Sequence, residues 1–264
     1  MKKPKHFHAS VCKFWVIAHR GASYYAPENT FAAFNKALEM GADMIELDVL
    51  LTKDGVPVVI HDNDLERLAG IQGKITDTDY EEVQKIDVGS WFAASYKDER
   101  IPTLREVLIW AKDKISLNIE IKAESVTDKA EGGIEEKVID LIREYEMEEY
   151  VLLSSFDYRA AERFSHLGSE IASAILYDKD QSRGKTASGL IQMYKCDYFN
   201  VNWRYLTLFS FHKPDINAQL MMVYTVNSRR LMRKLIRKGV YGIFSDRPDL
   251  LKEVADKEIS ERYG

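Results

Sequence analysis

The sequence predicts an α/β protein folded as a TIM (β/α)8 barrel with a small insertion after the second strand. Short apolar runs recur along the chain, and segments of helical periodicity lie between most of them. About eight such runs occur within 264 residues, close to the ~250 residues typical of this barrel. A doubly wound open sheet is the alternative fold, but the Gly-x-Gly-x-x-Gly turn expected after its first strand is absent.

The first three elements set the pattern. Phe14–Ala18 is a short apolar run followed by a turn at Gly21, as is typical of a buried strand. Thr30–Met40 carries apolar residues at helical spacing, and Gly41 follows it at the position of a helix-ending glycine. Met44–Leu51 then predicts a second strand. Strand, helix and strand in this order indicate a βαβ unit and therefore a parallel sheet.

The remaining elements continue the alternation. Further strands are expected at Ser116–Ile121, Val151–Ser154, Ile171–Tyr177, Tyr198–Val201, Met221–Val226 and Gly242–Ser245. The clearest helical patterns between and after them are Ile134–Tyr145, Arg159–Phe164, Ser228–Lys238 and Pro248–Asp256. We therefore expect one barrel domain over residues 14–264.

One segment interrupts this alternation. The Asp54-Gly55 turn is followed by the apolar run Val56–Ile60, which predicts a hairpin added to the second strand. Residues 62–102 are polar, contain glycine and lack a regular period, so we expect an insertion over one end of the barrel. Residues 1–13 are expected to form a polar N-terminal arm.

Composition and charge exclude several classes of protein. The chain is 45% hydrophobic and 30% charged, which excludes disordered and low-complexity classes. Its net charge of −5 argues against sequence-independent nucleic-acid binding. No apolar run approaches the ~20 residues of a membrane-spanning helix, and the N-terminal residues lack the apolar core of a secretory signal. With Cys12 and Cys196 as free thiols, we expect a cytoplasmic protein without nucleic-acid partner or stable membrane insertion; the oligomeric state stays open.

Three carboxylates fall where strands end. Glu46 and Asp48 lie two residues apart on one strand and therefore share a face, and Glu120 with Lys122 repeats this spacing on the next. In a TIM barrel, inward side chains at the carboxyl ends of strands converge on the active site. A hard divalent cation with oxygen ligands, Mg²⁺ or Ca²⁺, would offset the repulsion among them. The alternative is that the acids only form ion pairs with Arg20 and Lys122.

Two histidines occupy similar positions. His19 closes the first apolar run and His61 closes the hairpin strand. Either one alone is more simply a structural histidine, but a pair can act as general acid and general base near neutral pH. Arg20 and Lys122 offer a guanidinium fork and a point charge suited to phosphate. Together with the three acids, these residues indicate phosphoryl transfer assisted by a metal ion.

Taken in order, these and the surrounding motifs resemble the glycerophosphodiester phosphodiesterase family. The resemblance covers nearly the whole chain after Val16, and the order and spacing of the motifs in its first half are specific. The motifs that carry it are His19-Arg20-Gly21-Ala22, Pro27-Glu28-Asn29-Thr30, Gly41–Val49, Thr52-Lys53-Asp54-Gly55, Val58–Asp62, Ile101–Val107, Asn118–Lys122, Ser155-Phe156-Asp157, Tyr224-Thr225-Val226-Asn227 and Gly242–Pro248.

The resemblance implies a TIM barrel with an insertion after the second strand, and it implies a reaction. Enzymes of this family hydrolyse glycerophosphodiesters, such as glycerophosphocholine or glycerophosphoethanolamine, to glycerol 3-phosphate and the free alcohol. Residue by residue it implies an acid and base pair, metal ligands and phosphate-binding cations, which here are His19 and His61, then Glu46, Asp48 and Glu120, then Arg20 and Lys122.

The chain departs from the family pattern at three places. Leu68-Ala69 stands where the family usually has two threonines, Tyr224 stands where it usually has tryptophan, and Ser245 replaces a common threonine. None of these changes removes a reacting group. Because an aromatic wall is kept at position 224, we expect Tyr224 and Phe156 to contact the substrate.

Two competing functions remain at this stage. A related TIM-barrel phospholipase, of the phosphoinositide-specific C type or the lysophospholipase D type, would act on lipids and present an apolar rim to a membrane. A non-catalytic module would bind phosphodiesters without turning them over. The second alternative does not explain why both histidines and all three acids are present.

Overall fold

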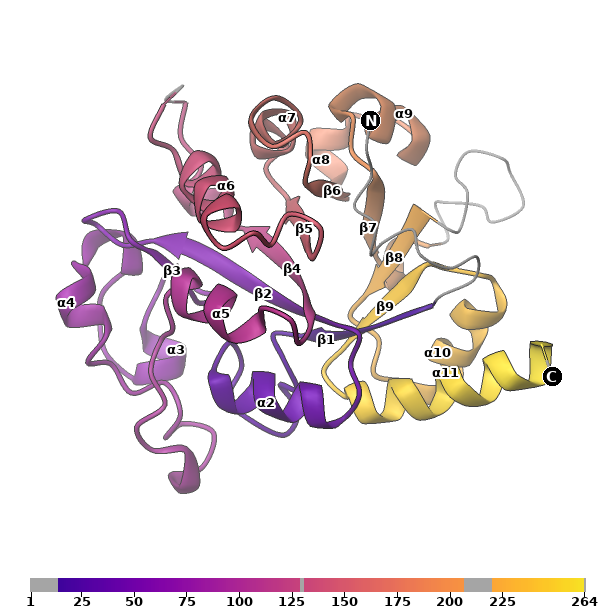
Figure 1. Ribbon diagram of the computed structural model, residues 1–264, viewed down its shortest axis with the longest axis horizontal. Coiled ribbons are helices and arrows are strands. Elements are labelled where there is room, and N and C mark those ends of the chain that lie inside the picture. The colour runs from indigo at the N-terminus through magenta and orange to yellow at the C-terminus, as the bar shows by residue number, and fades with distance from the viewer. Residues whose placement is uncertain (1–13, 129–130, 207–219, 264) are drawn as a thin grey trace.

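The structure is a computed structural model and describes residues 14–128, 131–206 and 220–263 (Figure 1). Its strands follow the predicted order along the chain. They are β1 (Trp15–His19), β2 (Met44–Leu51), β3 (Pro57–Val59), β4 (Ser116–Ile121), β5 (Val151–Ser155), β6 (Ala172–Leu176), β7 (Tyr198–Asn202), β8 (Met221–Tyr224) and β9 (Gly242–Ser245). The arm expected over residues 1–13, with Cys12, lies outside the described residues, and Cys196 is buried as a free thiol.

Eight of these described strands close into a parallel barrel. The strand order is β1-β9-β8-β7-β6-β5-β4-β2, and β1 pairs with β2 to complete the ring. The ninth, β3, pairs antiparallel with β2 through Val49 and Val59, as the hairpin pattern predicts. The TIM barrel fold class is therefore confirmed. The open doubly wound sheet is excluded, because in an open sheet β1 and β2 could not pair to close the ring.

Helices surround this barrel (Figure 1). The longer ones are α2 (Phe31–Glu39), α5 (Leu104–Ala111), α6 (Ile134–Glu144), α7 (Tyr158–Leu167), α9 (Ala187–Tyr194), α10 (Arg229–Arg237) and α11 (Pro248–Tyr263). Shorter segments after strands are η3 (Ala123–Ser125), α8 (Lys179–Ser182) and η4 (Trp203–Tyr205). None of the described helices is long and apolar enough to cross a lipid bilayer.

Several predicted bounds need correction. The strand expected to reach Val226 ends at Tyr224, and the last helix continues beyond Asp256 to Tyr263. α5 was not among the predicted helices, although its start carries a capping box in which Thr103 and Glu106 exchange hydrogen bonds with each other's backbone. With 8 residues, α5 is too short to show a clear helical period, but its capping residues Thr103 and Glu106 could have been recognised in the sequence.

The period of two along β2 separates side chains that pack against the helices from side chains that face the barrel interior. On β2, Ile45, Leu47 and Val49 pack between the barrel and the helices. Glu46 and Asp48 point into the barrel instead, because successive side chains of a strand face opposite sides. Alternation therefore sends the apolar residues of β2 outward and its two acids inward, toward the carboxyl end of the barrel.

The insertion after β2 is folded against the barrel rather than apart from it. It contains α3 (Glu66–Ala69), η1 (Ile75–Asp77), α4 (Tyr80–Val83) and η2 (Ala94–Tyr96). In Figure 1 β2 runs toward the left side of the picture, where α3 and α4 lie, so the insertion is at the carboxyl end of that strand. Its apolar residues share one cluster with barrel residues; the members are Leu50, Val58, Ile60, Leu65, Leu68, Ile75, Val83, Val88 and Ile101.

Candidate active site

The turn after β1 requires its glycine. Gly21 has φ +81°, and a Cβ at this position would lie 2.8 Å from the backbone of Ala33, so no other residue fits without a shift. Arg20 before it also has a positive φ of 53°. This backbone directs the amide of Arg20 at Glu46, to whose Oε2 it donates a hydrogen bond of 2.9 Å. The sharp turn thus joins the end of β1 to the acidic residues of β2.

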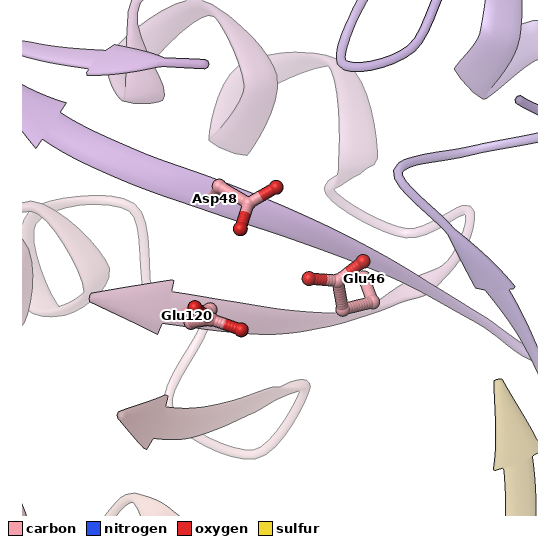
Figure 2. A group of neighbouring side chains, drawn as sticks. All are labelled: Glu46, Asp48 and Glu120. Atoms are coloured by element: carbon pink, nitrogen blue, oxygen red, sulfur yellow. The ribbon is translucent and has the colours of Figure 1, made fainter. Parts of the chain in front are cut away.

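Glu46, Asp48 and Glu120 come together at the carboxyl end of the barrel. Each offers one carboxylate oxygen, and these three oxygens lie within 4.8 Å of one another. All three side chains are buried. Figure 2 shows them on β2 and the neighbouring β4, where Asp48 and Glu120 are register partners. A compact set of carboxylates without sulfur or nitrogen donors fits a hard cation such as Mg²⁺ or Ca²⁺.

The two predicted phosphate-binding cations lie beside these acids. Lys122 Nζ is 3.0 Å from Glu120 Oε1 and 3.5 Å from Asp48 Oδ1. Arg20 Nε is 3.5 Å from Asp48 Oδ2, and Arg20 also pairs with Glu28. The ion pairs of the competing interpretation are therefore present. Two cations do not neutralise three carboxylates, however. Arg20 also pairs with a fourth carboxylate, that of Glu28, which leaves less of its charge for the cluster.

Burial and mutual repulsion make two of the three acids weaker acids than usual. Burial, followed by the charge of Asp48, raises the pKa of Glu120 to about 7 and the pKa of Glu46 well above its ordinary value. Burial also disfavours the charged form of Asp48, but the positive charges of Arg20 and Lys122 outweigh it and lower the pKa of Asp48. A divalent ion bound among these carboxylates would favour their ionised forms and lower the raised pKa values of Glu46 and Glu120.

Asn29 supports the cluster and was missing from the predicted site residues. Its Nδ2 donates to Asp48 Oδ2 at 3.0 Å, and its backbone amide donates to the carbonyl oxygen of Arg20 at 3.0 Å. Asn29 has φ 57°, a left-handed conformation that asparagine tolerates better than most residues. The Pro27-Glu28-Asn29-Thr30 motif was a signal for it, because asparagine is one of the few residues suited to this backbone.

His19 is oriented by an aspartate from the opposite end of the sequence. Its Nδ1 lies 2.7 Å from Oδ1 of Asp246, which follows β9, and its Nε2 lies 3.5 Å from Thr225 Oγ1. Asp246 also accepts hydrogen bonds from Ser23 and Asn227. Burial opposes the charge of Asp246, but its contact with His19, followed by the hydrogen bonds from Asn227 and Ser23, prevails and lowers the pKa of Asp246. An ionised carboxylate only accepts, so Nδ1 carries the proton and Nε2 is left unprotonated in the neutral ring.

His61 has the same kind of support from its neighbour. Its Nδ1 lies 2.5 Å from Asp62 Oδ1. Burial, together with the positive charges of Arg20 and Lys122, lowers the pKa of His61, although Asp48 opposes the shift. Both predicted histidines are half-buried and have one ring nitrogen next to a carboxylate.

Phe156 and Tyr224 meet at the same end of the barrel. Phe156 follows β5 and Tyr224 ends β8, and their ring centroids are 6.0 Å apart at an interplanar angle of 89°. Tyr224 also packs edge-on against Phe244. Burial raises the pKa of Tyr224, and the charge of Glu120 adds to this effect. The pair forms an aromatic wall near the acids; its contact with substrate remains a prediction.

Comparison with known proteins places this chain in a family. The model of the glycerophosphoryl diester phosphodiesterase family matches residues 19–250, from the last residue of β1 to the start of α11. The chain belongs to this family. The resemblance seen in the sequence motifs is confirmed, and the protein is a phosphoric diester hydrolase of the glycerophosphodiester phosphodiesterase kind.

Individual relatives agree with this membership. A glycerophosphodiester phosphodiesterase of Caldanaerobacter subterraneus subsp. tengcongensis is 37% identical over 256 residues, covering 93% of this chain and 99% of the relative. A crystal structure of such an enzyme from Agrobacterium tumefaciens has a TM-score of 0.77 at 28% identity and covers 91% of this chain and 100% of its own.

A third relative was solved with a reaction product. An Oleispira antarctica phosphodiesterase in complex with the product sn-glycerol-3-phosphate has a TM-score of 0.76 at 29% identity, and the match covers 97% of this chain and 100% of the other. All three comparisons extend over nearly the whole chain, so membership of the glycerophosphodiester phosphodiesterase family concerns the barrel as a whole and not one motif.

Proposed function

We propose that this family member hydrolyses glycerophosphodiesters to glycerol 3-phosphate and an alcohol at the carboxyl end of the barrel. The observation that carries the proposal is the gathering there of three buried carboxylates with two histidines whose rings are each held by an aspartate. The sn-glycerol-3-phosphate found with the Oleispira antarctica relative supports this choice of product.

We assign Glu46, Asp48 and Glu120 as the ligands of one divalent cation, Mg²⁺ or Ca²⁺. When bound, such an ion supplies Lewis-acid stabilisation of the negatively charged phosphodiester. Arg20 and Lys122 bind the same phosphate by charge and hydrogen bonding. Arg20 Nε supports this role, because this buried donor makes no hydrogen bond among the described residues and its ion-pair partner, Asp48 Oδ2, lies 3.5 Å away.

The two histidines would share the proton transfers. Asp246 and Asp62 keep the Nδ1 atoms protonated, which leaves each Nε2 free to accept or donate a proton. One imidazole removes the proton of the attacking oxygen while the other protonates the oxygen of the departing alcohol. Because both rings are held in the same way, they can exchange these roles between two successive steps.

The attacking oxygen in this proposal belongs to the substrate. Glycerophosphodiesters carry a hydroxyl next to the phosphoester, and an oriented intramolecular nucleophile has a large entropic advantage over water. Its oxygen bonds to phosphorus as the bond to the alcohol oxygen breaks, which gives a cyclic phosphate and the free alcohol. Water then opens the cyclic phosphate to glycerol 3-phosphate, with the histidines in reversed roles.

A 2-deoxyglycerol analogue of glycerophosphocholine distinguishes intramolecular attack from direct attack by water. The analogue keeps the charge and the headgroup but lacks the attacking hydroxyl. We expect it to inhibit hydrolysis of the parent diester competitively while being barely cleaved itself, as measured by release of choline. Cleavage at a rate close to that of the parent would rule out the intramolecular route and leave water as the nucleophile.

A panel of substrates tests the proposed function itself. Glycerophosphodiesters with different alcohols would be incubated with the full chain and Mg²⁺ or Ca²⁺, and glycerol 3-phosphate would be measured by a coupled assay. We expect its release from at least one diester. Cleavage restricted to lysophospholipids or phosphoinositides would indicate the phospholipase alternative, and binding without turnover would indicate a non-catalytic module.

A further inference from the structure

A continuous series of charged contacts joins His61 to Arg20, and its central member is Arg67 in the insertion. Asp62 contacts His61 through Oδ1, and its other oxygen, Oδ2, accepts a hydrogen bond from Nε of Arg67. The terminal nitrogens of Arg67 donate to both oxygens of Glu28, at 2.7 and 3.0 Å. Glu28 in turn accepts from Arg20 at 2.9 Å.

The guanidinium of Arg67 therefore divides its hydrogen bonds between two branches. One branch, through Asp62, ends at an imidazole that we assign to proton transfer. The other, through Glu28, ends at the guanidinium that we assign to phosphate binding. Arginine suits this place because its planar fork presents several donors in fixed directions and keeps its charge at any working pH.

The electrostatics of the two branches explain why a cation must stand between them. Burial opposes the charge on Glu28, but its hydrogen bond to Arg67 and the charge of Arg20 prevail and lower the pKa of Glu28. Burial also opposes the charge on Asp62, but its hydrogen bond to Arg67, followed by its contact with His61, prevails and lowers the pKa of Asp62. Without Arg67, Glu28 would have Arg20 as its remaining cation and would compete with phosphate for that guanidinium.

Arg67 contributes little to the packing of the insertion. Its side chain is 43% exposed, and it lies on α3, where Leu68 is the residue that joins the shared apolar cluster. Removal of the guanidinium leaves that cluster intact. The contacts of Arg67 are therefore aimed at the site and not at the core of the insertion.

We propose that Arg67 is a positioning residue that fixes both the imidazole of His61 and the guanidinium of Arg20 through their carboxylate partners. This inference rests on the proposed function, in which those two groups act on the phosphodiester. It also assigns a task to the insertion after β2: besides covering the barrel, it supplies the side chain that aligns a proton-transfer group with a phosphate-binding group.

The two branches predict separable kinetic effects. Asp62→Asn weakens the hold on His61 directly, and the hold on Arg20 only through Arg67, so it should mainly lower kcat. Glu28→Gln weakens the hold on Arg20 directly, and the hold on His61 only through Arg67, so it should mainly raise KM. Arg67→Gln disturbs both, so we expect kcat to fall and KM to rise together, with kcat/KM reduced on the order of 10- to 100-fold, the scale for losing hydrogen bonds between charged groups.

Arg67→Lys and added guanidinium test positioning more directly than loss of activity. A lysine ammonium is a point charge that cannot reproduce the fork, so Arg67→Lys should restore at most one of the two kinetic effects. Millimolar guanidinium ion should partly restore kcat/KM of Arg67→Ala, because it can bridge the two carboxylates again, while ammonium should not. A merely structural role would not respond to a small cation of this shape.

Arg105→Gln is the matched control, because Arg105 forms a similar exposed ion pair with Glu144 between α5 and α6. We expect it to keep wild-type kinetics, and all variants should keep the wild-type Tm. The inference is overturned if Arg67→Gln, with unchanged Tm, shows wild-type kcat and KM, whether or not Asp62→Asn or Glu28→Gln is impaired. Wild-type hydrolysis is measured in the same assay, so a protein inactive throughout would refute the proposed function instead.

Discussion

His19→Ala and His61→Ala are each expected to lower kcat by at least ~10²-fold, the usual scale for losing a positioned acid or base. Each substitution removes an imidazole whose Nδ1 is held by an aspartate, Asp246 for His19 and Asp62 for His61, and with it the Nε2 that we assign to proton transfer. Neither ring belongs to the apolar clusters, so both variants should remain folded. The measurement is steady-state release of glycerol 3-phosphate, with circular dichroism melting as the check on folding.

His166→Ala serves as the control for this pair. His166 lies exposed in the last turn of α7, on the outside of the barrel, and its removal should leave kcat unchanged. Turnover near the wild-type rate in either His19→Ala or His61→Ala would remove that histidine from the mechanism and make its contact with aspartate a structural one.

Glu46→Gln, Asp48→Asn and Glu120→Gln should each weaken binding of Mg²⁺ or Ca²⁺ by at least about tenfold, since even residues that only support metal ligands typically cost 10- to 100-fold. Each change keeps the shape of the side chain but replaces an anionic oxygen donor with a neutral one. Isothermal titration calorimetry of the ion with each variant measures the loss, and hydrolysis should decline in parallel.

Glu258→Gln is the matched control for the carboxylate variants. Glu258 is also buried and paired with arginines, Arg233 and Arg237, but it lies on α11 away from the barrel mouth. Its substitution should leave ion affinity unchanged. If all three site variants also bound the ion like the wild type, the acids would serve only as partners of Arg20 and Lys122.

The part of the site carried by strands could be predicted from the sequence. Two residues separated by one share a face of a strand, so Glu46 and Asp48 had to point the same way. The parallel pairing of β2 with β4 then places Glu120 opposite Asp48. The period of two and the order of the strands along the chain can both be read from the sequence. The closed barrel then brings the three acids together.

The supporting residues could not be predicted in this way. Asp246 meets His19 across 227 positions of sequence, a contact that exists only because β9 closes the barrel against β1. Arg67 lies in a segment without a regular period, and nothing local indicates that it reaches Glu28, which is 39 positions away. The Gly242–Pro248 motif drew attention to the segment that holds Asp246, whereas none of the motifs that carry the resemblance includes Arg67, and the roles of both residues depend on tertiary contacts.

The most direct test of the account compares glycerophosphocholine hydrolysis by one protein sample before chelation, after exhaustive chelation and after return of Mg²⁺ or Ca²⁺. The account predicts that release of glycerol 3-phosphate ceases on chelation and resumes with the ion in the wild type, and that Glu120→Gln requires a higher ion concentration for the same recovery. Full activity in the chelated protein would contradict the metal assignment and leave the three acids as ion-pair partners.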